Sequence, residues 1–178
     1  PAVDPLPGST QKYFAICQDK LGMVPNVLQA HAFNIEKLNA FTALYNELML
    51  ADSGLSKLER EMIAVVVSSI NRCFYCLTAH GAAVRELSGD PILGEQLVMN
   101  YRAANLDARQ RAMLDFTALL TSASYTAEEQ HRQSLRDVGF SEHDIWDIIN
   151  IAAFFNMTNR VASGTAMVPN DEYHNSAR

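Results

Sequence analysis

The 178-residue sequence contains only three cysteines, and two of them lie three positions apart. This count and spacing do not suit a secreted protein held together by disulfides. They favour a reducing compartment, in which a cysteine pair is more often catalytic or metal-binding. We therefore expect a cytoplasmic protein.

The sequence also lacks an excess of basic residues and a long apolar run. Its net charge is −6 and its pI is about 5.3. Without a basic stripe, a nucleic-acid or membrane-surface partner is not expected. No apolar run approaches the roughly 18 residues of a membrane-spanning helix, and no signal-peptide pattern opens the sequence.

What is present is ordinary globular composition, with 48% hydrophobic and 19% charged residues. A chain of this size can bury a core without disulfide or metal staples, so we expect one domain over residues 1–178. Residues 165–178 look like a loosely held C-terminal arm.

Helix signals recur along the whole chain, and no alternating strand pattern appears between turns. Ser9 and Gly22 are placed to begin and end a first helix. Two capping boxes are predicted at Ser56–Glu59 and Thr126–Glu129, and Ser141 with Asp144 begins a long helix to about Ser163. The sequence predicts an all-α, multi-helix fold. A central helix is expected to include residues 62–67, which are apolar nearly all round.

A weak internal repeat is also visible. The tetrapeptide Phe-Thr-Ala-Leu occurs at residues 41–44 and again at 116–119. Aligning Ser56 with Ser141 also aligns Asn71 with Asn156. The repeat is short enough to arise by chance, so two related helical halves and an unrepeated bundle both stay open.

The most informative pattern is formed by Glu61, Cys73, Cys76 and His80. A Cys-x-x-Cys pair can close a redox-active disulfide, and a cysteine must be a thiolate to react. His80 follows Cys76 by four residues and lies on the same helical face, where it could exchange a proton with that thiol. If the helices on either side of residues 71–72 fold back antiparallel, Glu61 comes level with His80. The spacing thus allows a Glu–His–Cys chain within one helical hairpin.

Other interpretations of these residues stay open. The cysteines could be buried apolar residues, or zinc ligands with His80, although no nearby cysteine or histidine offers a fourth ligand. Cys17 lies on the apolar face of the first helix and is interpreted as core. The polar residues Asn156, Asn159 and Arg160 fit no pattern that assigns them chemistry. No nucleotide, haem or flavin motif is present, so no cofactor is expected.

The stretch from Glu61 to His80 resembles the core motif of the alkylhydroperoxidase D-like proteins in the carboxymuconolactone decarboxylase superfamily. The wider chain resembles its subgroup of uncharacterised peroxidase-related enzymes, through segments at residues 22–26, 71–76, 156–160 and 169–173. The resemblance implies an all-helical homo-oligomer, a dimer, trimer or hexamer.

By the same resemblance, Cys76 is the peroxidatic nucleophile, Cys73 the resolving thiol, and His80 with Glu61 the relay that deprotonates Cys76. Characterised members have a histidine where this chain has Tyr75. A phenol cannot replace an imidazole as a base near neutral pH.

Together these features predict a thiol-dependent peroxidase that acts on a peroxide substrate and is reduced by an external dithiol or protein thiol. Two rivals are a general disulfide reductase at the same site and a non-catalytic helical module that senses redox state or binds metal.

Overall fold

A computed structural model describes residues 6–178, and this part of the chain is helical with no strand. The all-α prediction is therefore confirmed. In chain order the helices are α1 (Gly8–Leu21), α2 (Asn26–His31), α3 (Ile35–Met49), α4 (Lys57–Ile70), α5 (Phe74–Ser88), α6 (Pro91–Asn100), η1 (Tyr101–Ala103), α7 (Ala108–Ala123), η2 (Ser124–Thr126), α8 (Glu129–Asp137), α9 (Glu142–Gly164) and α10 (Glu172–Asn175).

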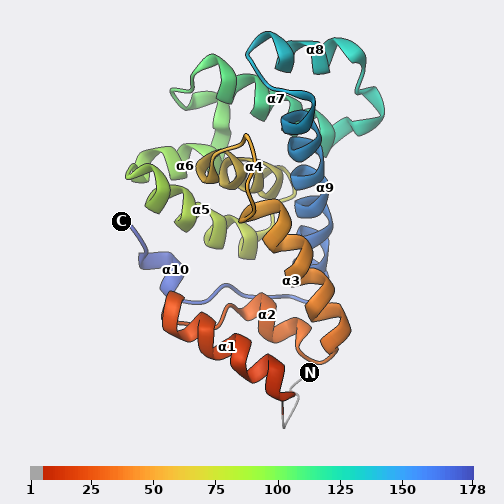
Figure 1. Cartoon of the computed structure of the whole chain (residues 1–178). Helices are drawn as coiled ribbons and strands as arrows, with labels where there is room; N and C mark the ends of the chain where they lie inside the picture. Colours follow the sequence, from red (N-terminus) through yellow and green to blue (C-terminus); the bar gives the residue numbers. More distant parts are fainter. Residues whose placement is uncertain (1–5) are drawn as a thin grey trace.

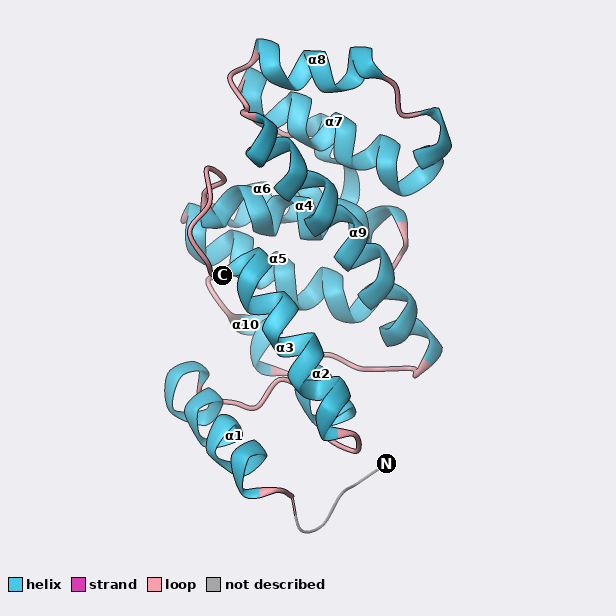
Figure 2. Ribbon diagram, turned by 45° about the vertical axis from the view of Figure 1, so that its right-hand side comes forward, coloured by secondary structure: helices cyan, strands magenta, loops and turns pink. Residues whose placement is uncertain are grey.

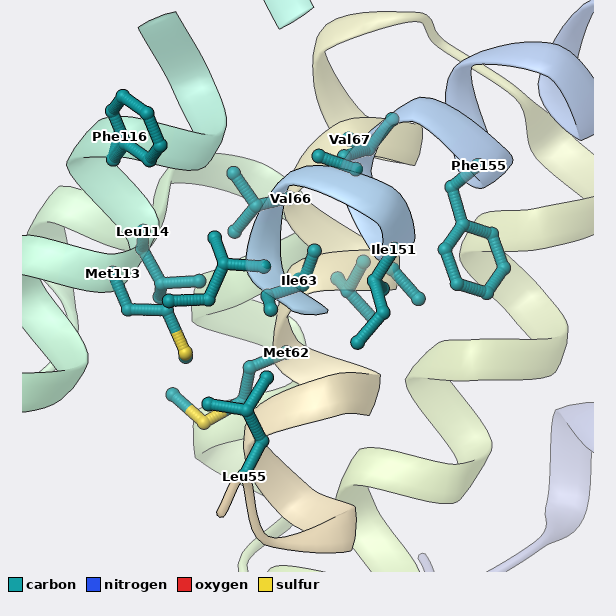
Figure 3. Close-up of a cluster of buried hydrophobic side chains, with 14 of the residues drawn as sticks. Leu55, Met62, Ile63, Val66, Val67, Met113, Leu114, Phe116, Ile151 and Phe155 are labelled. Atoms are coloured by element: carbon teal, nitrogen blue, oxygen red, sulfur yellow. The ribbon is translucent and has the colours of Figure 1, made fainter. Parts of the chain in front are cut away.

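Helix α4 lies at the centre of the main hydrophobic core, as its apolar sequence predicts. Each residue from Met62 to Val67 has no exposed surface. Figure 3 shows side chains of α4 meeting those of α7 and α9, with Met113, Leu114 and Ile151 among the contacts. A helix buried on all sides gives a rigid base for any polar residue it carries, here Glu61 and Ser68.

Side-chain caps fix several helix starts. The capping boxes at Ser56–Glu59 and at Ser141–Asp144 are both formed. Two expected starts are wrong. The first helix begins at Gly8 after Pro7, so Ser9 lies inside it. The predicted Thr126 box is replaced by one in which Glu128 pairs with His131. In both places the helix begins within a few residues of the predicted start, and capping signals in the sequence do not define a helix end more finely than this.

The helices are arranged along the length of α9. Helices α7 and α8 lie at one end, α1 and α2 at the other, and α4, α5 and α6 between them (Figures 1 and 2). Within residues 6–178, no helix is both long enough and apolar enough to cross a lipid bilayer.

The C-terminal strap, residues 165–178, crosses the molecule between α5 and the α1–α2 end (Figure 1). We expected this segment to be loosely held, but it makes specific contacts. Arg85 of α5 donates to the carbonyls of Tyr173 and Ser176 at 2.9 and 3.0 Å. Asn26 of α2 donates from its backbone N–H to Oδ1 of Asn170 and from its side chain to the carbonyl of Val168. The sequence shows no helix pattern in this segment. Hydrogen bonds from distant side chains to the carbonyls of the strap cannot be predicted from the sequence.

Candidate active site

The turn between α4 and α5 places the first cysteine. Helix α4 ends in a Schellman motif, in which the Cys73 N–H donates to the Ser68 carbonyl and the Arg72 N–H donates to the Ser69 carbonyl. Arg72 takes the left-handed position with φ of 54°, where glycine is usual. A non-glycine residue there is strained, and the surrounding hydrogen bonds hold it. The turn brings α5 back along α4.

Cys73 is the N-cap residue of α5, and Cys76 follows one turn later. Both are free thiols in the structure, and we call them the thiol pair. Their exposed fractions are 1% and 4%. They form a buried cluster with Tyr75, Ala79 and Ala162, and Val27, Met167 and Tyr173 pack against this cluster. Both thiols therefore lie in the interior, almost out of contact with solvent.

The two thiols hold their protons very differently. A hydrogen bond from the Cys76 thiol, helped by the Cys76 backbone N–H, Ser163 and the electrostatic influence of His80, lowers the pKa of Cys73 from 9.0 to about 6 against the opposing effect of burial. The pKa of Cys76 is raised, because it donates to Cys73, is buried and would ionise beside a thiolate. The first proton thus leaves the pair easily and the second does not, so near pH 7 the pair carries one negative charge.

Glu61 and His80 meet across the hairpin formed by α4 and α5. The Nδ1 atom of His80 lies 2.6 Å from Oε2 of Glu61. An ionised carboxylate only accepts hydrogen bonds, so Nδ1 carries the proton and Nε2 is left free. The edge of the Phe155 ring contacts the imidazole, with ring centroids 4.6 Å apart. Glu61 therefore fixes the orientation and tautomer of His80, as the spacing in the sequence allowed.

A polar network behind Cys76 could not be assigned from the sequence. Asn159 of α9 donates to Ser68 Oγ at 3.0 Å, and its Oδ1 accepts from Asn71 at 3.0 Å. Asn71 also donates to Asn156. The side chains of Asn159 and Ser68 favour the Cys76 thiolate and partly offset the effects that raise its pKa. Asparagine is a poor helix former, so Asn156 and Asn159 inside the long helix α9 were the available signal.

Arg160 contacts this network only at its solvent-exposed edge, through Asn156. It is exposed, and its guanidinium donates back to the carbonyl of Asn156 one turn earlier. Its contacts give it a role in the surface of α9 and none at the thiol pair.

Tyr75 lies within the Cys-x-x-Cys sequence, but its hydroxyl is not placed to act as a base for the thiols. Its hydroxyl accepts a hydrogen bond from the Val27 N–H at 3.1 Å. Burial raises the pKa of Tyr75, and burial also raises the pKa of its neighbour Tyr173 to about 12, with the Tyr75 hydrogen bond opposing that rise. Tyr75 is thus a neutral phenol that joins α5 to α2 and the C-terminal strap.

The third cysteine is separate from the pair. Cys17 lies in a hydrophobic cluster with Leu28, Ala32 and Leu38, and burial raises the pKa of its thiol. Over residues 6–178, no three or more His, Cys, Asp or Glu side chains are grouped so that they could hold a metal ion.

Comparisons with known proteins agree with this site. Residues 36–91 match the carboxymuconolactone decarboxylase family, a range that contains all four motif residues. No match was found among curated proteins. An uncharacterised peroxidase-related protein from Silicibacter sp. TM1040 has 73% identity and a TM-score of 0.99, over 100% of this chain and 93% of that one.

Two further solved structures are similar. An uncharacterised peroxidase-related protein from Ralstonia eutropha JMP134, described as an alkylhydroperoxidase AhpD core, has 42% identity and a TM-score of 0.96, over 100% of this chain and 94% of that one. The debrominase Bmp8 has 17% identity and a TM-score of 0.79, over 96% and 90% of the two chains, which shows the fold alone. By its sequence identity and coverage, this chain belongs to the carboxymuconolactone decarboxylase family, among its alkylhydroperoxidase D-like members.

Proposed function

We propose that this protein is a thiol-dependent peroxidase that reduces a peroxide at the Cys73–Cys76 pair with help from Glu61 and His80. The observation that carries the proposal is the Glu61–His80 hydrogen bond beside a buried pair in which one thiol has its pKa lowered to about 6. A purely structural pair of buried cysteines has no need of an ionised member. The peroxidase-related names of the similar proteins support the same chemistry.

The reaction uses the proton that the pair loses when it ionises. His80 accepts it at Nε2, and Glu61 stabilises the imidazolium through Nδ1. The remaining thiolate attacks the O–O bond of the peroxide, forming a sulfenic acid and an alkoxide, and the imidazolium returns its proton to the alkoxide. The second thiol condenses with the sulfenic acid, releasing water and forming the disulfide. An external dithiol then reduces the disulfide by exchange and is itself oxidised.

The resemblance and the electrostatics differ on which sulfur attacks. Similarity assigns Cys76 as the nucleophile and Cys73 as the resolving thiol. The resting negative charge, however, is favoured on Cys73. Because the two sulfurs share one proton, the charge can move from Cys73 to Cys76 by transfer of that proton along their hydrogen bond. Trapping the sulfenic acid with dimedone in Cys73→Ser and Cys76→Ser variants identifies the attacking sulfur.

Peroxide consumption with a panel of dithiols and protein thiols tests the proposal. We expect turnover with at least one reductant, and loss of turnover in both serine variants. Mass spectrometry after mild oxidation should show a loss of two hydrogens in the peptide that contains both cysteines. Disulfide exchange without any peroxide turnover would favour the general disulfide reductase instead.

We further propose that the protein works as a homo-oligomer. The outer face of α9 carries exposed apolar residues at helical spacing, including Trp146, Met157 and Val161 with exposed fractions of 66%, 48% and 39%. Light scattering at micromolar concentration should give at least a dimer, and a monomer would contradict this assembly.

A further inference from the structure

Two segments far apart in the sequence pack against the buried cluster that contains the thiol pair. Val27 belongs to α2, and Met167 and Tyr173 belong to the C-terminal strap. All three are only partly buried, while Cys73 and Cys76 are almost fully buried. Any thiol that reduces a Cys73–Cys76 disulfide must bring its own sulfur into line with the bond, and these side chains stand in the way.

The two covering segments are bound to each other by reciprocal hydrogen bonds. Oδ1 of Asn170 accepts from the Asn26 N–H at 2.8 Å, and Nδ2 of Asn170 donates to the Val24 carbonyl at 3.0 Å. In return, Nδ2 of Asn26 donates to the Val168 carbonyl at 3.0 Å. We call α2 with its preceding residues 23–25, together with the strap, the cover.

The cover is attached to the helix that carries the pair at only a few polar points. Tyr75 accepts from Val27 and contacts Tyr173, and Arg85 holds the far end of the strap. The strap also begins and ends at strained residues, since Ala166 and Ala177 both have φ of 51°. Alanine in this region is unfavourable by roughly 1–2 kcal/mol, so contacts along the strap must maintain both turns.

The outer side of the cover faces a hollow. A cavity of about 470 Å³ lies between α1 and the strap, and Asn170 and Glu172 line it with Phe14 and Gln18 of α1. Close packing resists motion in a protein interior, and here the strap has open space beside it. The strap therefore has open space on one side at Asn170 and Glu172.

We infer that Tyr75 is a positioning residue that latches this cover over the thiol pair, and that the cover must release before a bulky thiol reaches either sulfur. This inference rests on the proposed peroxidase function, because it concerns access of the reductant to the same site. It also explains the phenol at position 75, which replaces a potential base by a hydroxyl that joins three segments. Access to the pair is then set by an equilibrium between closed and open cover.

The test compares Tyr75→Phe and Asn170→Ala with the reduced wild-type protein. Each variant loses contacts of the closed cover, so opening should increase about fivefold per hydrogen bond lost. The thiol pair is labelled either with iodoacetamide or with a maleimide carrying a polyethylene glycol chain, and the labelled peptide is quantified by mass spectrometry. Hydrogen exchange is measured on peptides from the strap and from α4.

A matched control removes a buried phenol elsewhere. Tyr101 of η1 is also buried, and its hydroxyl donates to Asp115 at 2.7 Å. Tyr101→Phe should leave the labelling of the thiol pair unchanged. We expect Tyr75→Phe and Asn170→Ala each to raise the rate of bulky labelling relative to small labelling by at least about fivefold. Exchange in the strap should rise with it, while α4 stays protected.

Three results would overturn the inference. In the first, the ratio of bulky to small labelling stays constant in both variants. In the second, the ratio rises equally in Tyr101→Phe. In the third, it rises only together with hydrogen exchange in α4, and that joint rise would indicate general loosening of the fold. Labelling and exchange need no turnover, so these results are independent of whether the protein consumes peroxide. If the variants behave as predicted but the protein consumes no peroxide, the inference about the cover stands and the proposed peroxidase function is refuted.

Discussion

Replacing Cys76 by alanine should remove much of the shift that lowers the pKa of Cys73. The hydrogen bond from the Cys76 thiol is the largest cause of the lowered Cys73 pKa. Alanine removes this donor but keeps the backbone N–H at position 76. The substitution therefore separates the contribution of the neighbouring thiol from that of the helix N-terminus.

The expected magnitude follows from the two pKa values. At pH 7 a thiol with a pKa of about 6 is about 90% ionised, whereas one with the ordinary value of 9.0 is about 1% ionised. Full loss of the shift would lower the thiolate fraction about ninetyfold. Ser163, His80 and the backbone N–H still act in the variant, so we expect a smaller drop, of at least tenfold.

Ultraviolet thiolate absorbance as a function of pH measures this directly. Cys76→Ser is the matched control, because its hydroxyl can still donate to Cys73 and should keep much of the shift. Burial raises the pKa of Cys17, so that thiol titrates at higher pH and does not obscure the transition. If Cys76→Ala still titrates near pH 6, the low pKa does not come from the paired thiol and our reasoning about the pair is wrong.

Four further predictions concern the relay, the network, the pH dependence and the core. His80→Asn and Glu61→Gln should each slow the reaction with peroxide, by up to the ~10²–10⁴-fold typical of acid–base assistance, with an unchanged helical circular dichroism spectrum; wild-type rates would contradict the relay. Asn159→Ala should lower the free energy of unfolding by about 1–3 kcal/mol in urea denaturation, because Ser68 and Asn71 lose a buried partner, and a neutral result would contradict the network. Because the pKa of Cys73 is lowered in the folded state, the unfolded chain binds more protons at Cys73 than the folded chain does between about pH 6 and 9. The reduced wild-type protein should therefore gain stability relative to Cys73→Ser as the pH rises through this range, by at most about 1.4 kcal/mol per pH unit. This gain should be lost as the pH falls through 6. Ile63→Ala should cost about 2–5 kcal/mol in the same denaturation assay, since Ile63 has no exposed surface and its removal leaves a cavity.

The sequence predicted the parts of this structure that depend on short-range physics. Helix starts with a side-chain cap, such as Ser56 and Ser141, were predicted correctly because the capping residue and its partner are three positions apart. The meeting of Glu61 with His80 was also predictable, since one tight turn joins two helices of known rise per residue.

The features that the sequence did not reveal depend on distant segments. The strap is held by Arg85 and Asn26, which are separated from it by some 90 and 140 positions, and nothing local marks those contacts. The electrostatics of the thiol pair likewise include Ser163, which favours the Cys73 thiolate, and Asn159, which favours the Cys76 thiolate. Helix α9 brings both residues to the pair from the other end of the chain.

The central claim is that the thiol pair reduces a peroxide at the expense of an external dithiol. The most direct measurement is the stoichiometry of peroxide consumed to dithiol oxidised, for the wild-type protein and for Cys73→Ser and Cys76→Ser. We predict one peroxide consumed per dithiol oxidised by the wild type, and no catalytic turnover with either serine variant. Turnover that persists when either cysteine is replaced, or dithiol oxidation without loss of peroxide, would contradict the proposed function.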